Sequence, residues 1–315
     1  MQLDIISYHD VLDSSNQPAH RSLVSALLDK GIVGISHVPT FAEKSRAYVN
    51  AARQFAALPE EVKKQYTPDR DAGVTEGYEL GAEKFKDDNG SWVVEDKKVS
   101  YYAYVPDDVR NTWPREVDLQ TPYLDLGQLI FATGKVVLNV IEANASFNLP
   151  HHLVAGYGRM LHYLKEGEMT NANPNWCGAH FDHGLFTGLM PAYYFCDGKE
   201  VDEPEEAGLF VAARSDGHFE KVYVPEKSIM LFQVGEFGQL HSDDRIRATK
   251  HMVKKAYNGI ERYAFALFNS VVDEHVIKST SVLTQDQRYS QNQSEDGSIS
   301  YGAWQKASYD RYRVM

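Results

Sequence analysis

Apolar residues recur along this chain with two different spacings, and the spacing changes near residue 158. Before that point, apolar positions three and four residues apart predict amphipathic helices. We expect these helices at residues 19–30, 41–58 and 122–145. Short apolar runs predict strands at residues 3–7, 31–39 and 100–105. Residues 66–91 combine proline, glycine and charge without a period, which predicts a long surface loop.

From residue 158 onward, short apolar runs alternate with turn residues. The runs lie at 159–164, 178–183, 185–195, 208–214, 218–224, 228–234, 247–253 and 262–269. The sequence Ser-Asp-Gly-His at 215–218 is typical of a hairpin turn between two of them. Short strands in this number, with no helix between them, favour a closed or double-sheet β structure, of which the jelly roll is the usual form.

The whole pattern predicts an α+β protein with a mainly β core. We expect a double-stranded β-helix (jelly roll) with a helical N-terminal region packed on it. The expected parts are a helical and mixed region at 1–150, the jelly-roll core at 151–280, and a C-terminal part at 281–315. Within the last part, the polar residues 281–299 predict loop, and residues 301–312 predict a terminal helix that could act as a lid.

The composition is that of an ordinary globular protein, with 43% hydrophobic and 24% charged residues among 315. No apolar run approaches the roughly 20 residues that cross a bilayer, and the start lacks the basic residues of a signal peptide. We therefore expect no membrane partner. The net charge of −12 argues against nucleic acid as the main partner. Two cysteines, Cys177 and Cys196, are too few for a disulfide framework, so a cytoplasmic location is expected. The sequence does not indicate the oligomeric state.

Candidate chemistry centres on the segment Gly178-Ala179-His180-Phe181-Asp182. His180 and Asp182 are two residues apart, so their side chains would share one side of an extended strand. An imidazole and a carboxylate side by side supply two of the three ligands of a 2-His-1-carboxylate triad. That triad leaves three positions open on a non-haem Fe(II).

The third ligand would be one of the histidines that follow Asp182, which are His183, His218, His241, His251 and His275. His183 would point away from His180 in a continuing strand, His218 lies in the predicted turn, and His275 lies past the last core strand. His241 belongs to a second His-x-Asp pair, but the residues after it, Ser-Asp-Asp at 242–244, are typical of a polar hairpin tip.

We favour His251 as the third ligand. It lies in the apolar run at 247–253, where Thr249, His251 and Val253 would share one face of a strand. Arg262 then enters an apolar strand as its first residue. An arginine in that position either extends outward to solvent or holds an anion inside.

These motifs, in this order, resemble those of the isopenicillin N synthase-like family of Fe(II)/2-oxoglutarate-dependent oxygenases, which includes plant flavonoid and gibberellin oxygenases. The segments that carry the resemblance are His180-Phe181-Asp182 with Leu185-Phe186-Thr187, residues 247–253, Arg262-Tyr263-Ala264, and the N-terminal residues 31–38, 55–63 and Gly77-Tyr78. The resemblance covers most of the chain.

The resemblance implies an enzyme, a dioxygenase that oxidises a small molecule by hydroxylation or desaturation and releases succinate and CO2. His180, Asp182 and His251 would hold Fe(II), and O2 and 2-oxoglutarate would be cosubstrates. Arg262 would bind the distal carboxylate of 2-oxoglutarate, with Tyr163 donating a second hydrogen bond. Tyr101 and Tyr102 lie where family members often line the substrate pocket. Phe268, six residues beyond Arg262 on the same face of its strand, is also expected to border the substrate.

Two positions depart from the family pattern. The serine of its Arg-x-Ser motif is Ala264 here, and the asparagine of its Asn-x-Tyr motif is Leu161. A lost hydrogen bond to a charged group is worth ~1.5–3 kcal/mol, so the cosubstrate could differ. The alternatives are therefore a non-haem iron oxidase on the same scaffold that does not use 2-oxoglutarate, and a non-catalytic metal-binding β-barrel.

Overall fold

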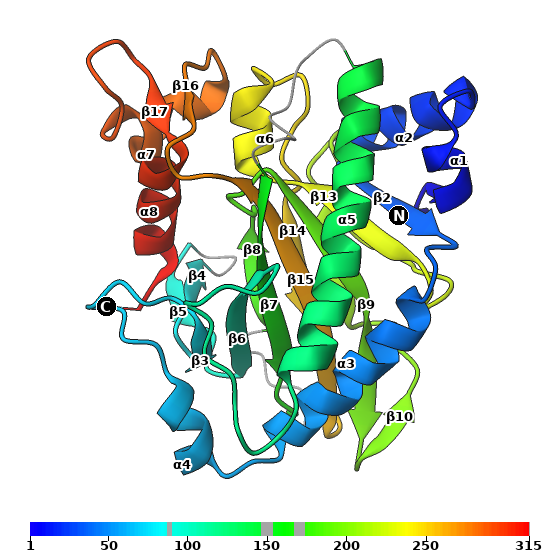
Figure 1. The fold of residues 1–315 in the computed structure, drawn as a ribbon, viewed down its shortest axis with the longest axis vertical. Helices are drawn as coiled ribbons and strands as arrows, with labels where there is room; N and C mark the ends of the chain where they lie inside the picture. The colour runs from blue at the N-terminus through cyan, green and yellow to red at the C-terminus, as the bar shows by residue number, and fades with distance from the viewer. Residues whose placement is uncertain (87–89, 146–153, 167–173, 315) are drawn as a thin grey trace.

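We describe the protein from a computed structural model, which covers residues 1–86, 90–145, 154–166 and 174–314 (Figure 1). Its largest feature is a nine-stranded sheet in the order β1-β2-β13-β9-β15-β7-β6-β3, with β10 paired to β9. The strands are β1 (Ile5–Ser7), β2 (Ile32–Ser36), β13 (Met230–Val234), β9 (Phe186–Cys196), β15 (Ile260–Val271), β7 (Val154–Tyr163), β6 (Lys98–Val105), β3 (Gly77–Leu80) and β10 (Lys199–Val201).

A second sheet of four strands faces the first across a cavity. Its order is β12 (Phe219–Lys221), β11 (Gly208–Ala212), β14 (His251–Lys254) and β8 (Asn175–His180). All pairs within it are antiparallel. Side chains from the facing surfaces of both sheets, including Tyr163, Trp176, Tyr194, Val253 and Ala266, form one buried cluster.

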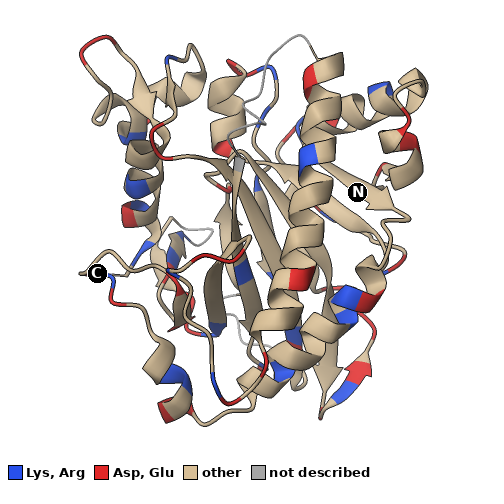
Figure 2. Cartoon of the chain, viewed as in Figure 1, with Lys and Arg blue, Asp and Glu red and all other residues tan. Residues whose placement is uncertain are grey.

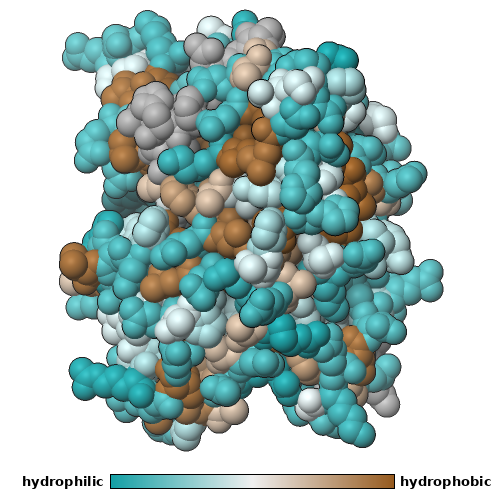
Figure 3. Space-filling model, turned by 45° about the vertical axis from the view of Figure 1, so that its right-hand side comes forward, coloured by the Kyte–Doolittle hydropathy of each residue, from teal (hydrophilic) through white to brown (hydrophobic). Residues whose placement is uncertain are grey.

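Helices cover the other face of the large sheet (Figure 1). They are α1 (Tyr8–Leu12), α2 (Gln17–Asp29), α3 (Phe41–Ala56) and α5 (Gln120–Asn144). Apolar residues at helical spacing on α5, such as Leu126, Ile130, Val137 and Ile141, are buried there in the main hydrophobic core. Charged residues of both signs are interspersed over the helices and loops (Figure 2). On the face drawn in Figure 3, apolar residues are scattered among hydrophilic ones.

Helix α5 lies very close to the sheet. A Cβ atom added at Gly188 of β9 would lie 2.3 Å from Cγ2 of Ile130, so this contact requires glycine. By length and hydropathy, α5 could also cross a membrane, contrary to the expectation from the sequence. However, 56% of its apolar window is buried inside the molecule, which is what packing on the sheet requires.

The predicted helices and most of the predicted strands are confirmed, but two predicted loops are wrong in part. Residues 66–91 contain β3 and β4 (Lys84–Lys86), which pairs with β5 (Trp92–Val94). Residues 281–299 contain the 3₁₀-helix η3 (Val282–Gln285) and α7 (Gln287–Ser290), and β17 (Ile299–Ser300) pairs with β16 (Val276–Ile277). These elements are only two to four residues long, too short for a hydrophobic period to appear.

Two strands at the candidate site have other bounds than predicted. The strand expected at 178–183 ends at His180, and the one expected at 247–253 begins at His251. The short helices α4 (Glu60–Lys63), η1 (Lys64–Tyr66) and α6 (Glu236–His241) were not predicted. The expected boundary at residue 150 lies outside the described residues.

The C-terminal helix α8 (Tyr301–Tyr312) is confirmed and lies beside the sheets (Figure 1). A buried ion pair fixes this region: Arg288 of α7 donates to Glu236 of α6 through Nη1 (2.6 Å) and Nη2 (2.8 Å). The guanidinium also lies 4.3 Å from the Trp304 ring centroid, and Trp304 donates to the carbonyl of His183 (2.9 Å). The C-terminal region is thus attached to the loop that carries Asp182.

We predict that Arg288→Met lowers the free energy of unfolding by ~3–5 kcal/mol, because it leaves the buried Glu236 carboxylate without its partner. Urea denaturation followed by circular dichroism measures this. The double variant Arg288→Met/Glu236→Leu should recover most of the loss. Lys306→Met, which breaks an exposed ion pair with Asp310 on α8, is the control and should change little. An equal loss of unfolding free energy in Arg288→Met and Lys306→Met would contradict the prediction.

Candidate metal centre

The candidate site lies where β8 and β14 run side by side. His180 is the last residue of β8, His251 is the first residue of β14, and the two are direct cross-strand partners. Asp182 lies in the loop just after β8. His180 and Asp182 do lie together as predicted, but the predicted reason, a shared strand face, is wrong. The strand has already ended, and the loop turns the carboxylate back toward the imidazoles.

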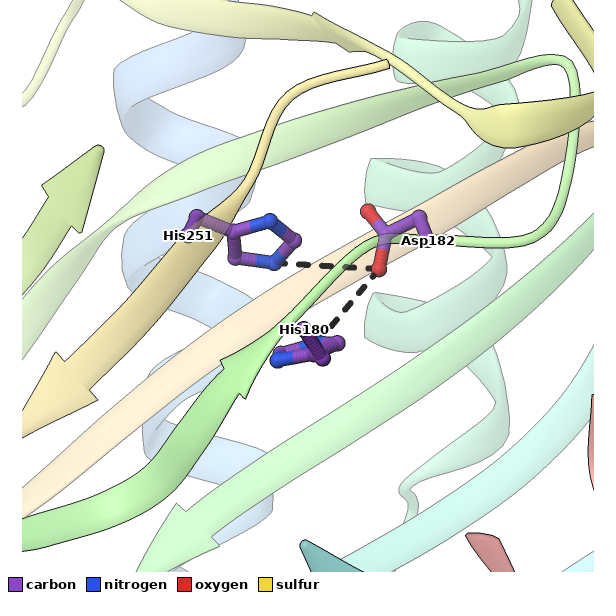
Figure 4. Close-up of side chains that lie close together, drawn as sticks. All are labelled: His180, Asp182 and His251. Atoms are coloured by element: carbon purple, nitrogen blue, oxygen red, sulfur yellow. Dashed lines mark ion pairs between the residues drawn. The ribbon is translucent and has the colours of Figure 1, made fainter. Parts of the chain in front are cut away.

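The three side chains point toward one another (Figure 4). Nε2 of His180 and Nε2 of His251 each lie 3.7 Å from Oδ1 of Asp182. The three candidate ligand atoms all lie within 4.8 Å of one another. The structure thus brings the three predicted ligands together.

Hydrogen bonds fix the tautomer of both imidazoles. Nδ1 of His180 lies 2.8 Å from the carbonyl of Gly178, and Nδ1 of His251 lies 3.0 Å from the carbonyl of Thr249. A carbonyl only accepts, so each Nδ1 carries a proton, and in the neutral imidazole Nε2 then presents a lone pair. This arrangement is common for histidines that bind metals.

Asp182 is held in an equally specific way. Its Oδ2 accepts hydrogen bonds from Thr187 Oγ1 and Gln233 Nε2, both at 2.6 Å, which leaves Oδ1 facing the two imidazoles. Burial favours a raised pKa, but the two imidazoles and these two hydrogen bonds outweigh it and hold the pKa of Asp182 below its ordinary value. Burial, together with the nearby His180, lowers the pKa of His251 to about 4.

One ionised carboxylate and two neutral imidazoles are the ligand forms that a divalent cation requires. The three ligand atoms face one point, and Gln233 Nε2, which donates to Asp182, also lies 3.3 Å from Nε2 of His251. The residues present therefore fit a metal ion such as Fe(II).

Beside the triad lies a cavity of about 340 Å³ between the two sheets. Arg262 lines it and is buried, with 7% of its surface exposed. The arginine therefore points inward, not outward to solvent. Its Nε donates to the hydroxyl of Tyr194 (3.2 Å), and its guanidinium lies 4.9 Å from the ring centroid of Tyr163. Among the described residues, no carboxylate lies within 4.0 Å of this guanidinium.

Sequence reasoning missed Tyr194. This residue of β9 is the cross-strand partner of Arg262, and its hydroxyl is also hydrogen-bonded to Glu203. Glu203 in turn pairs with Lys221 at 3.0 Å. The guanidinium is thus oriented from one side and remains free on the cavity side. No spacing in the sequence relates Tyr194 to Arg262, because they are 68 residues apart.

The other predicted site residues lie in different environments. Tyr163, Ala264 and Phe268 line the cavity. Tyr101 does not: it is fully buried against the helices, with its ring 5.2 Å from that of Phe55. Tyr102, its neighbour, lies on the opposite face of β6, under the guanidinium of Arg159. The two tyrosines therefore cannot have the same role.

Among the described residues, the histidines set aside in the sequence do not belong to the cluster of candidate ligands. His241 ends α6, and residues 242–244 form the predicted polar turn, but after a helix and not in a hairpin. The ring of His241 stacks on His275 at 5.4 Å. The ring of His183 lies 4.9 Å from that of Tyr309. His218 does lie in the turn between β11 and β12, as expected. Cys177 is a buried free thiol, also as expected.

No sequence-family profile matches this chain, and no curated protein matches it in sequence. Solved structures do match in fold. A protein from Caulobacter crescentus assigned to the 2OG-Fe(II) oxygenase family has a TM-score of 0.75 and 19% identity, over 98% of this chain and 99% of that one. A full-length Neurospora crassa protein in complex with alpha-KG has a TM-score of 0.74 and 19% identity, over 98% and 96%.

JOX2 in complex with 2OG, Fe and JA has a TM-score of 0.69 and 16% identity, over 97% of this chain and 84% of that one. All three likenesses span nearly the whole of this chain, from the N-terminal helices to α8. The chain therefore has the fold of the 2-oxoglutarate- and Fe(II)-dependent oxygenases.

Proposed function

We propose that this protein is an Fe(II)- and 2-oxoglutarate-dependent dioxygenase that oxidises a small organic molecule. The observation that carries this proposal is the combination of the His180–Asp182–His251 triad with the buried, inward-facing Arg262 in one cavity. A metal site with only a structural role has no need of a buried cation in the same cavity. A cosubstrate that chelates the metal at one end and carries a carboxylate at the other uses both.

His180, Asp182 and His251 would hold Fe(II). When bound, Fe(II) supplies the redox chemistry that couples decarboxylation of 2-oxoglutarate by O2, giving succinate and CO2, to oxidation of a substrate C–H bond by hydroxylation or desaturation. Arg262 would bind the distal carboxylate, since its planar fork suits bidentate pairing. Tyr163 would donate a second hydrogen bond. Tyr194 holds the guanidinium in position through its Nε.

The cavity wall would exclude water from the reacting groups. Leu161, Leu189, Ala264, Ala266 and Phe268 line it with apolar surface. In such surroundings a fixed cation interacts more strongly with a carboxylate than it does in water. The protein's own contribution would be to orient the reacting groups and to keep water away from them.

The solved structures of similar fold support a small-molecule substrate. One complex of the Neurospora crassa protein contains thymine, and the JOX2 complex contains JA. We also propose that the two facing sheets form a double-stranded β-helix, as in the isopenicillin N synthase-like group. A cytoplasmic location remains our proposal from the two free cysteines.

One observation favours a second candidate, a non-haem iron oxidase that does not use 2-oxoglutarate. Ala264 and Leu161 are direct cross-strand partners on β15 and β7, and both replace polar residues of the family pattern. The carboxylate site would therefore have fewer donors than the family provides. Arg262, Tyr163 and Tyr194 remain, so we favour the 2-oxoglutarate-dependent reaction.

The first prediction from this proposal concerns the metal. Under anaerobic conditions the purified protein should bind one Fe(II), or Co(II) as a spectroscopic probe. Asp182→Ala should weaken that affinity by roughly 100-fold or more, since loss of even a residue behind a ligand costs 10- to 100-fold. His241→Ala is the control and should bind normally. Loss of metal in the His241 variant and retention in the Asp182 variant would exclude the triad.

A second prediction concerns Arg262. Replacing it with Met should raise the 2-oxoglutarate concentration required for succinate formation by at least about tenfold, since each ~1.4 kcal/mol of lost binding is a factor of ten. Metal content should stay unchanged, because Arg262 is not a ligand. An unchanged 2-oxoglutarate requirement would favour the oxidase alternative.

The third prediction concerns Ala264, which lies two residues beyond Arg262 on the same face of β15. Ala264→Ser should tighten 2-oxoglutarate binding by up to ~1.5–3 kcal/mol, the value of a hydrogen bond to a charged group. The measurement is the 2-oxoglutarate dependence of succinate formation in wild type, Ala264→Ser, Tyr163→Phe and the double variant. If the new hydroxyl leaves affinity unchanged or weakens it, 2-oxoglutarate as cosubstrate loses support.

A further inference from the structure

A buried group of charged residues borders the cavity next to His180, and the reaction proposed above does not use it. Lys98 of β6 and Arg159 of β7 both line the cavity. Nζ of Lys98 lies 3.5 Å from Sγ of Cys177, which lies 3.7 Å from Nδ1 of His180. The charged group therefore lies within two contacts of a candidate metal ligand.

Arg159 is fixed by its neighbours yet keeps donors free. Its Nε and Nη2 donate to Ser100 Oγ at 3.0 and 2.8 Å, and Nη2 also donates to Glu83 at 2.7 Å. The guanidinium lies 5.0 Å from the ring centroid of Tyr102. Within the described part of the chain, Nη1 donates no hydrogen bond. A side chain held in this way loses little rotamer freedom when a ligand binds.

Positive charge exceeds negative charge around Tyr102. Three guanidinium groups lie within 6.0 Å of its ring centroid, those of Arg70, Arg159 and Arg313. With Lys98 these make four cations, and the carboxylates paired with them are Glu79, Glu83 and Glu95. None of the three carboxylates lines the cavity, whereas Lys98 and Arg159 do. Asp182, Asp202 and Glu203 also line the cavity, so the cationic part of its wall is the part formed by Lys98 and Arg159.

This surface is too far from Arg262 to share one cosubstrate. Arg262 on β15 and Arg159 on β7 lie on neighbouring strands, where Arg262 faces Tyr163 and Arg159 faces Ala266. The two arginines are therefore four residues apart along the strands, roughly 13 Å at about 3.3 Å per residue. A five-carbon dicarboxylate bound at Arg262 therefore leaves Arg159 available for a second molecule.

We propose that the primary substrate is a small organic acid and that its carboxylate binds Arg159. This inference rests on the proposed function, in which Arg262 binds the cosubstrate. An acid held at Arg159 lies on the His180 side of the triad, with the carbon atoms next to its carboxylate directed toward the metal. The cavity of about 340 Å³ must hold both molecules, which limits the substrate to a size similar to that of the cosubstrate.

The test compares acids with neutral molecules of the same shape. The full-length protein, loaded anaerobically with Mn(II) and 2-oxoglutarate, is titrated calorimetrically with phenylacetate, 4-methylbenzoate and hexanoate, and with the primary alcohol matching each acid. At least one acid should bind tenfold or more tighter than its alcohol. Arg159→Met should remove that preference, and Arg159→Lys, which keeps a cation, should retain part of it. Arg70→Met is the matched control, because Arg70 also lies over Tyr102 but does not line the cavity.

The inference is overturned if the wild type binds none of the acids more tightly than its alcohol, or if Arg159→Met weakens acid and alcohol equally. Circular dichroism of each variant checks folding. If Arg159→Met does not fold, Arg159→Lys replaces it, and an unchanged preference for the acid over its alcohol in that variant contradicts the inference. Titration of the Mn(II) protein with 2-oxoglutarate alone separates the two proposals. If 2-oxoglutarate does not bind but the preference for acids is intact, the proposed cosubstrate is rejected and Arg159 stays as an acid site. If 2-oxoglutarate binds but no acid is preferred over its alcohol, only the present inference is rejected.

Discussion

The antiparallel pairing of β8 with β14 is the constraint on which the site depends. It sets His180 directly opposite His251, so that two imidazoles from residues far apart in the sequence face one point. A shift of one residue in this register would turn one imidazole to the other face of the small sheet. The pairing also places the loop after β8 over the same point, which allows Asp182 to complete the triad. Buried hydrogen bonds from Thr187 and Gln233, both on the large sheet, then join the two sheets at the triad.

The interior between the sheets is unusual because it is both buried and charged. Arg262, Lys98 and Arg159 all line one cavity of a small apolar core. Buried cations are costly unless they are paired or hydrogen-bonded. Arg159 and Lys98 meet that condition through carboxylates behind the wall, whereas Arg262 is held by tyrosines alone among the described residues. The structure thus keeps one cation without a carboxylate partner where the cosubstrate is expected.

How far the sequence could predict this structure depends on how local the signal is. Helices α3 and α5 and strands β9 and β15 are long enough for their hydrophobic period to identify them. The His-x-Asp spacing identified two residues that lie together in the triad, although the strand that explained it ends two residues before Asp182. Tyr194 and Arg159 could not be found in this way. Their roles arise from the register of strands that are distant in the sequence, and a charged residue such as Arg159 normally indicates the surface.

The position of β2 in the large sheet has a consequence for folding during synthesis. β2 pairs with β13 through partners such as Ile35 and Met230, and the hydrogen bond from Thr249 to Gly31 joins residues 218 apart. During synthesis the N-terminal helices and β2 therefore leave the ribosome long before their sheet partner exists. Contacts of such long range slow folding, because a large loop must close before they form. Throughout that interval the apolar face of β2 and the helices beside it stay without their final cover, so we expect nascent chains of this protein to depend on chaperones.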